Sequence, residues 1–174
     1  FGLHGTLAQV DLSRICMDAE GLRHSERDFG VKSVYLDLAV DFAQEDVTGY
    51  AELMVIVASA DGALVKEELA IIEALMGRCM MHPEMRVNIR NMLENPPALD
   101  LVVSRLNPVV LKIALRDAML VAAVDGEYDD SEIKIIKALA KAAGVRKKEL
   151  SALFEWVKSG WKWHNESFQY LGLL

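Results

Sequence analysis

The chain has 174 residues, with 26 Asp and Glu against 19 Lys and Arg, a net charge of −7 and 52% hydrophobic residues. At this length folding removes roughly 70% of the unfolded chain's surface from water, so we expect one soluble globular domain without extensive disorder. The acidic balance argues against nucleic acid as a partner, because a phosphate footprint needs a basic face. No uncharged apolar run reaches the roughly 20 residues that span a bilayer. The abundance of Ala, Leu, Met, Glu and Lys predicts an all-α fold.

The cysteines and the start of the chain bear on the compartment. Cys16 and Cys79 each stand alone in the sequence, so no zinc ligand pair is spelled out. Two buried, reduced thiols are expected, and these suit the cytoplasm or an equivalent reducing compartment. The chain begins at Phe1 rather than Met, which keeps a removed targeting segment open as an alternative.

The first half of the chain alternates helical periodicity with glycine and proline. Residues 1–30 are expected to form an irregular N-terminal arm, and the domain proper is expected over residues 31–160. Gly62 can end a helix in the left-handed conformation, and Pro83 suits the first position of another. Helices are predicted over residues 33–43, 47–60, 66–80 and 83–93.

The next helix is the most apolar of the chain. Pro96-Pro97 interrupts the pattern, and a short apolar segment follows. Asn107 has the residue type of an N-cap and precedes a proline, which predicts a helix over residues 108–124 that ends at Asp125-Gly126. Because this helix is apolar nearly all round, it belongs at the centre of a bundle.

The last part of the chain combines an acidic helix start with an aromatic end. Asp129 and Glu132 have the spacing of a capping box, which predicts that a helix begins there. A final helix is predicted over residues 147–159, ending before Gly160. Residues 161–174 are expected to form a separate aromatic C-terminal tail.

An internal repeat relates residues 53–75 to residues 117–139 at an offset of 64 residues. Nine of 23 aligned positions are identical, and they include both Asp-Gly turns and the Glu that follows each turn. Each copy predicts a helix, an Asp-Gly turn and a second helix. We therefore expect two repeated hairpins that pack their apolar faces together as one bundle.

The repeat also carries a family resemblance. Residues 58–62 and 122–126 read Ala-Ser-Ala-Asp-Gly and Ala-Ala-Val-Asp-Gly, and each is followed by an acidic helix start and an Ile-Ile pair. This arrangement resembles the TerB-like family, which comprises the tellurite-resistance B proteins and the N-terminal domain of the DjlA co-chaperone. The likeness covers about residues 34–158, and it is stronger in the second copy.

The resemblance implies an all-helical bundle of about seven helices, with an acidic metal-binding site near the two Asp-Gly turns. It also implies a role in stress responses at the cytoplasmic face of membranes, beside integral membrane partners, and no established enzymatic reaction. The first copy departs from the pattern, because residues 63–66 are Ala-Leu-Val-Lys where the second copy is acidic. The resemblance implies that the acidic metal-site residues of the family correspond to Asp61, Glu68, Asp125 and Glu132.

Ligand chemistry gives a second view of the acidic residues. Residues 125–132 match the second half of a calcium-binding EF-hand loop, but Val121 and Ala123 supply no oxygen where the first half needs ligands. Two hypotheses remain: a site for Ca²⁺ or Mg²⁺, or acids that simply favour a helix start. The candidate metal ligands are Asp61, Glu68, Asp125, Glu127, Asp129, Asp130 and Glu132.

Catalytic motifs are absent from the sequence. The four histidines are scattered, and none lies four residues from another as a metal-binding helix pair requires. No serine lies in a nucleophile-elbow glycine pattern, and no glycine-rich loop that cradles phosphate is present. We therefore predict that the protein is not an enzyme.

Two sets of side chains are candidates for partner binding. Five methionines surround the third and fourth predicted helices and suit either an adaptable groove or core filling: Met76, Met80, Met81, Met85 and Met92. Aromatic residues near the chain end suit either closure of the bundle or docking onto a protein or a membrane interface: Trp156, Trp161, Trp163, Phe168 and Tyr170.

These patterns together predict a non-catalytic, TerB-like binding or scaffolding module with a Ca²⁺ or Mg²⁺ site at the acidic turns. The alternative is an interaction subunit of a larger assembly, including a membrane-bound one, that docks through its aromatic tail and has no metal role. In both cases the expected partner is a protein and not nucleic acid.

Overall fold

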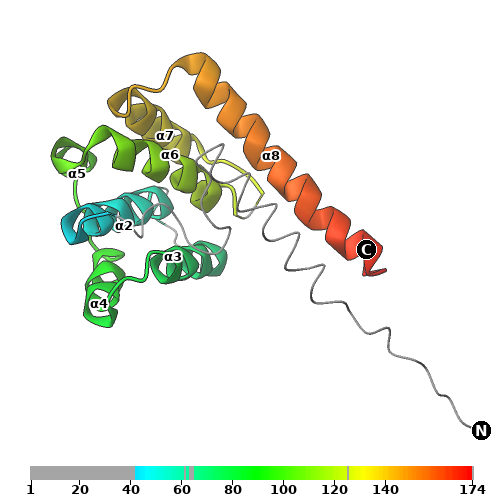
Figure 1. The fold of residues 1–174 in the computed structure, drawn as a ribbon, viewed down its shortest axis with the longest axis horizontal. Helices are drawn as coiled ribbons and strands as arrows, with labels where there is room; N and C mark the ends of the chain where they lie inside the picture. Colours follow the sequence, from blue (N-terminus) through cyan, green and yellow to red (C-terminus); the bar gives the residue numbers. More distant parts are fainter. Residues whose placement is uncertain (1–41, 61, 63–64, 125, 174) are drawn as a thin grey trace, which may run out of the picture. The chain divides into compact units, whose positions relative to one another are not determined.

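The computed structural model describes residues 42–60, 62, 65–124 and 126–173. All the regular structure in these residues is helical, which confirms the predicted all-α class. The predicted N-terminal arm, Cys16 and most of the helix predicted over residues 33–43 lie outside the described residues. The helices of Figure 1 are α2 (Gln44–Ala58), α3 (Lys66–Arg78), α4 (Pro83–Met92), α5 (Leu99–Arg105), α6 (Pro108–Ala122), α7 (Asp130–Ala142) and α8 (Lys147–Tyr170).

Helices α2 and α6 form the centre of the bundle and pack more extensively against each other than any other pair. Leu53, Leu115 and Met119 are completely buried between them and their neighbours. The side chain of Asn107 accepts hydrogen bonds from the amides of Val109 and Val110 at 2.9 and 3.0 Å, so the predicted N-cap of α6 is confirmed. The apolar character of α6 thus matches its central position.

Each central helix is followed by a turn and a second helix that packs on it, α3 after α2 and α7 after α6. Gly62 and Gly126 lie in these turns with φ of +81° and +97°. These angles are costly for a residue with a Cβ atom, which is why the two turns contain glycine. The adjoining Asp61 and Asp125 lie outside the described residues.

Helix α5 is an element that the sequence analysis described only as a short apolar segment. Its seven residues carry too little periodicity to identify a helix. An ion pair between Arg105 and the buried Glu52 joins α5 to α2. At Gly49 in α2, an added Cβ would lie 2.6 Å from the Cδ2 atom of Leu106, so the absence of a side chain lets the end of α5 approach closely.

The prediction that the last helix ends before Gly160 is wrong, because α8 continues without interruption to Tyr170. A glycine inside a helix costs only about 1 kcal/mol relative to alanine, which the other residues of a 24-residue helix offset. The helix ends instead at Tyr170, and Gly172, which follows the C-cap Leu171, has a φ of +65°. The amide of Leu173 donates to the carbonyl of Phe168 across this glycine at 2.9 Å, the bond that defines a Schellman motif.

One buried carboxylate connects the two central helices. Asp117 of α6 is completely buried and accepts a hydrogen bond of 2.8 Å from the hydroxyl of Tyr50 in α2. Arg116 donates to both carboxylate oxygens of Asp117, at 2.6 and 2.7 Å. A buried charge needs such partners, because leaving water otherwise costs several kcal/mol.

We predict that Asp117→Ala destabilises the fold by about 3–5 kcal/mol, since it removes one partner of a buried ion pair. Tyr50→Phe should cost about 1.5–3 kcal/mol, the range for one hydrogen bond to a charged group. Urea unfolding followed by circular dichroism measures both values. The exposed Lys137→Ala in α7 serves as the control and should stay within about 0.5 kcal/mol of the parent. Parent-like stability of Asp117→Ala would contradict a structural role for this network.

Candidate functional site

The acidic residues after the two turns serve as helix caps. Glu68 of α3 accepts a hydrogen bond from the amide of Val65 at 2.8 Å, and Glu132 of α7 accepts one from the amide of Asp129 at the same distance. Asp129 in turn accepts from the amide of Ser131 at 2.7 Å, which confirms the predicted capping box of α7. Glu68 and Glu132 are both buried, and each accepts from an amide at the start of its helix, where the amides lack partners within the helix.

The other candidate metal ligands do not assemble around these caps in the described residues. Glu127 and Asp130 are exposed, and Asp61 and Asp125 lie outside the part of the chain that the structure describes. Within that part, no group of three or more His, Cys, Asp or Glu side chains is arranged to hold a metal ion. The Ca²⁺ or Mg²⁺ site therefore stays a prediction.

Tyr128 attaches the second turn to the bundle. Its hydroxyl donates to the carbonyl of Met119 in α6 at 3.0 Å, and its ring meets the ring of Phe154 in α8 edge to face at 5.1 Å. Burial, with a smaller contribution from the negative charge of Glu132, raises the pKa of Tyr128 to about 12. The phenol is thus held neutral as a donor that joins the turn, α6 and α8.

This raised pKa predicts an alkaline loss of stability. The ordinary pKa of tyrosine is 10.0, so between pH 10 and about 12 the unfolded state loses the Tyr128 proton before the folded state does. The free energy of unfolding should therefore fall as the pH rises through this window. Tyr128→Phe should flatten the fall, whereas Tyr170→Phe, which removes an exposed tyrosine, should leave it unchanged. Equal slopes in the two variants, measured by urea unfolding, would contradict the assignment.

The apolar side of α8 continues beyond the part of the helix that packs on the bundle. Leu150, Phe154 and Val157 pack against the core. The same alternation of three- and four-residue steps then continues along the helix, and this is the spacing of a helix that packs lengthwise on another. We call this row the α8 seam; it comprises Leu150, Phe154, Val157, Trp161, His164, Phe168 and Leu171.

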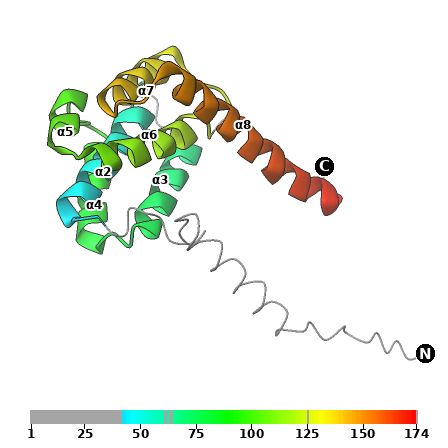
Figure 2. The ribbon, with the colours of Figure 1, turned by 45° about the horizontal axis from the view of Figure 1, so that its top comes forward.

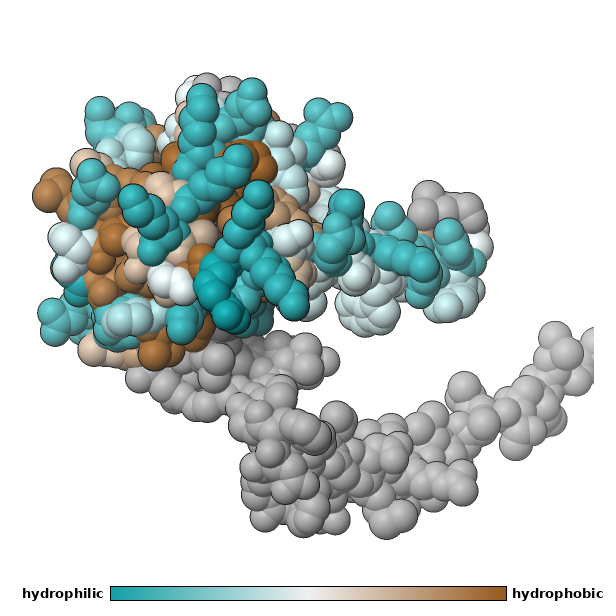
Figure 3. Space-filling view, turned by 90° about the horizontal axis from the view of Figure 1, so that it is seen from above, coloured by the Kyte–Doolittle hydropathy of each residue, from teal (hydrophilic) through white to brown (hydrophobic). Residues whose placement is uncertain are grey.

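The second half of the seam belongs to residues 158–170, the α8 extension. This segment projects past the other labelled helices (Figures 1 and 2) and stands clear of the bundle surface in the space-filling view (Figure 3). A second aromatic row lies about 130° round the helix from the seam and repeats at seven-residue steps. Trp156, Trp163 and Tyr170 form this row and are 48%, 75% and 83% exposed. The extension therefore presents a broad aromatic face to its surroundings.

An apolar groove with a volume of about 380 Å³ lies where the extension leaves the bundle. Its lining includes Ile71 of α3, Leu120 of α6, and Trp161 and His164 of α8. The ring of His164 meets that of Phe168 edge to face at 5.1 Å, so the groove leads directly onto the seam. At Gly160, which also lines the groove, an added Cβ would meet no atom within 4 Å.

The predicted partner-binding aromatics all lie on α8 and not on a separate tail. Phe168 is partly buried, and Trp156 lines the groove together with Trp161. Leu120 and Ile71 are not recognisable as site residues from the sequence, because nothing local indicates that they meet α8. The seam was not among the predicted features, although its spacing is present in the sequence.

Comparisons of the chain with protein-family models, with curated proteins and with solved structures find no match. Between residues 42 and 173, apart from the gaps given above, no helix combines the length and hydropathy that crossing a bilayer requires.

Proposed function

We propose that the protein is a non-catalytic interaction module of the TerB-like type, and that it binds an apolar-faced helix of a partner protein along the α8 extension. The continuation of the α8 seam beyond the bundle is the observation that carries this proposal. The first half of the seam packs on α6 and the core. The second half has the same spacing, with Trp161, His164 and Leu171 exposed and Phe168 partly buried. A helix laid along it would complete the packing that the bundle provides for the first half.

The spacing favours a helix over other partner structures. Steps of three and four residues keep one side of a helix in register with a second helix over several turns. Gly160 and Ser167 flank the seam on one side and leave room for close approach. Aromatic side chains supply a large contact area at low entropic cost, which is why they dominate binding hot spots.

The size of the apolar face supports binding as well. Large contiguous apolar patches are rare on monomeric proteins and mark interaction sites. Trp163 and Tyr170 of the α8 extension, and Leu171 directly after it, are all more than 70% exposed. Burial of such side chains is worth roughly 1.5–3 kcal/mol each. The partner in this proposal is a helix of a larger assembly, including one from an integral membrane protein as the family resemblance implies.

The proposal is tested by photo-crosslinking in cells of the source organism, with a benzophenone amino acid at position 171, a seam residue that is 72% exposed. The same amino acid at Lys137, exposed on α7, is the control site. We expect one discrete heteromeric product from position 171 and none from position 137. Combining the label with Trp161→Ala and Phe168→Ala should reduce the product at least about tenfold, because central aromatic contacts contribute about 2 kcal/mol or more each.

Two controls separate lost binding from lost folding. Lys162→Ala lies on the polar side of α8 and should keep the product. Circular dichroism and the unfolding midpoint of the double variant should show that the bundle stays folded. A product that survives the double variant would contradict the proposal. A product made only of two copies of this chain would show that the seam pairs with itself and not with a partner.

A further inference from the structure

A second cavity, lined by sulfur-containing side chains, lies where α3 ends and α4 begins. Its volume is about 320 Å³, and α2 closes its far side. The five methionines that the sequence analysis grouped do not share one surface, since Met76 is completely enclosed and Met92 is not part of this lining. The lining side chains that carry sulfur or imidazole donor atoms are Cys79, Met80, Met81, His82 and Met85.

We propose that this cavity binds a soft monovalent metal ion, Cu(I) or Ag(I), through the Cys79 thiolate and the Met thioethers, with the His82 imidazole at the rim. Thiolate and thioether ligands select Cu(I), whereas carboxylates select harder ions. The cavity lining contains three thioethers, one thiol and one imidazole within seven residues of sequence. The arrangement is independent of the α8 extension and of the acidic turns.

The position of Met80 is the first argument for the site. Helices α3, α7 and α8 all end in Schellman motifs, in which the residue after the C-cap has a positive φ. Gly144 and Gly172 fill this position after α7 and α8, with φ of +68° and +65°. After α3 the position holds Met80, with φ of +51°, although a residue with a side chain is strained there.

The side chain of Met80 does not offset this strain by packing against the core. It is 70% exposed and lies at the rim of the cavity. Glycine or asparagine would suit the backbone better, so folding does not explain a methionine here. Strained, non-glycine residues of this kind cluster at functional sites. A thioether that contributes to metal binding accounts for both the strain and the exposure.

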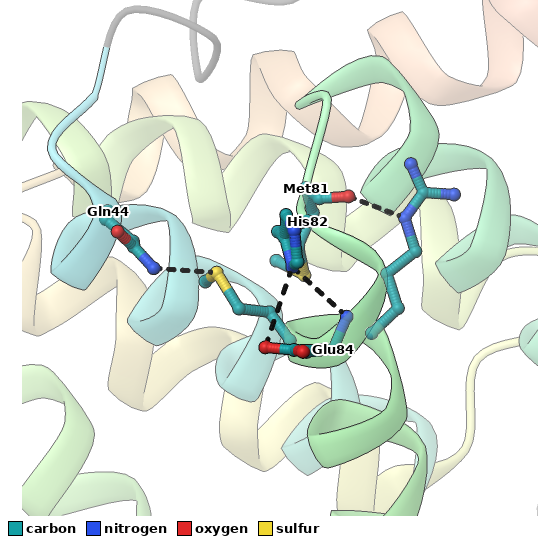
Figure 4. A network of polar contacts seen from close by, with 6 residues as sticks. Gln44, Met81, His82 and Glu84 are labelled. Carbon is teal, nitrogen blue, oxygen red and sulfur yellow. Dashed lines mark hydrogen bonds and ion pairs between the residues drawn. The ribbon is translucent and has the colours of Figure 1, made fainter.

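The donors on the inner side of the cavity are positioned by neighbouring groups. Cys79 is buried and is not part of a disulfide. Gln44 of α2 donates a hydrogen bond to the sulfur of Met85 at 3.2 Å, which orients this thioether and leaves its second lone pair available (Figure 4). Arg86 donates to the backbone carbonyl of Met81 at 2.8 Å and fixes the turn that carries the donors.

His82 has the surroundings of a metal-binding imidazole. Its Nδ1 atom accepts a long hydrogen bond of 3.4 Å from the amide of Glu84, and the Glu84 carboxylate lies 4.0 Å from the same nitrogen (Figure 4). Binding of the metal through Nε2 places the ring proton on Nδ1. Nδ1 then no longer accepts the hydrogen bond from the Glu84 amide and instead donates its proton toward the Glu84 carboxylate. Many metal-bound histidines donate to a carboxylate in this way.

The test uses the metal-free, reduced full chain, titrated anaerobically with Cu(I) against a coloured Cu(I) chelator. We expect one equivalent of Cu(I) to bind, with one proton released from the Cys79 thiol. Met85→Leu removes a direct ligand. Its affinity for Cu(I) should therefore fall by more than the roughly 10- to 100-fold that is typical when a residue next to a metal ligand is lost. Met92→Leu, on the same helix but outside the cavity, and Cys16→Ser should bind Cu(I) as the parent does.

Met80→Gly separates metal binding from packing. The change relieves the backbone strain, so the unfolding midpoint of the metal-free protein should rise, while the affinity for Cu(I) should fall. A purely structural Met80 would leave the affinity unchanged. The proposal is overturned if Met80→Gly and Met85→Leu both bind Cu(I) like the parent, or if Cys16→Ser abolishes binding. It is also overturned if the protein takes no Cu(I) from the chelator. Ag(I), which needs no reductant, should give the same order of variants.

Discussion

The packing of α2 on α6 is the constraint on which the rest of the fold depends. These two helices are apolar over most of their surface, and each therefore needs cover on several sides. The Tyr50–Asp117 hydrogen bond fixes their relative position, because a buried carboxylate tolerates little displacement from its donors. Helices α3 and α7 follow through short turns and cover the pair, so the remaining elements find their positions from this contact.

The same centre sets where α8 leaves the bundle. Tyr128 reaches from the second turn to the Met119 carbonyl in α6, and its ring holds Phe154 of α8. Val157 is the last residue of α8 that is buried, and every residue from 158 to 165 is exposed. The bundle thus supports only the first half of the helix. The second half keeps the seam spacing, and its first residues, Trp161 and His164, line the groove at the edge of the bundle. A binding role for the extension therefore rests on this spacing and exposure as well as on its aromatic composition.

The sequence predicted features that depend on a few neighbouring residues, and it failed where distant contacts decide. The Asn107 cap and the Asp129–Glu132 capping box are local hydrogen-bond patterns, and both are confirmed. The predicted end of α8 was wrong because nothing in the sequence distinguishes Gly160 from Gly172 as the residue that follows the helix. Only the hydrogen bond from the Leu173 amide to the Phe168 carbonyl shows that the helix ends before Gly172. The apolar groove was not predictable, because Leu120 and Ile71 reach it only through the packing of α3 and α6.

The capping of the two turns also limits how they can bind a cation. A carboxylate has lone pairs for several partners, but an oxygen that already accepts a bond from a helix-start amide gives up helix stabilisation if it turns toward an ion. Glu68 and Glu132 are in this position in both hairpins. Glu127 and Asp130 of the second hairpin are exposed. A cation that drew on Glu68 or Glu132 would therefore bind at the expense of a helix cap.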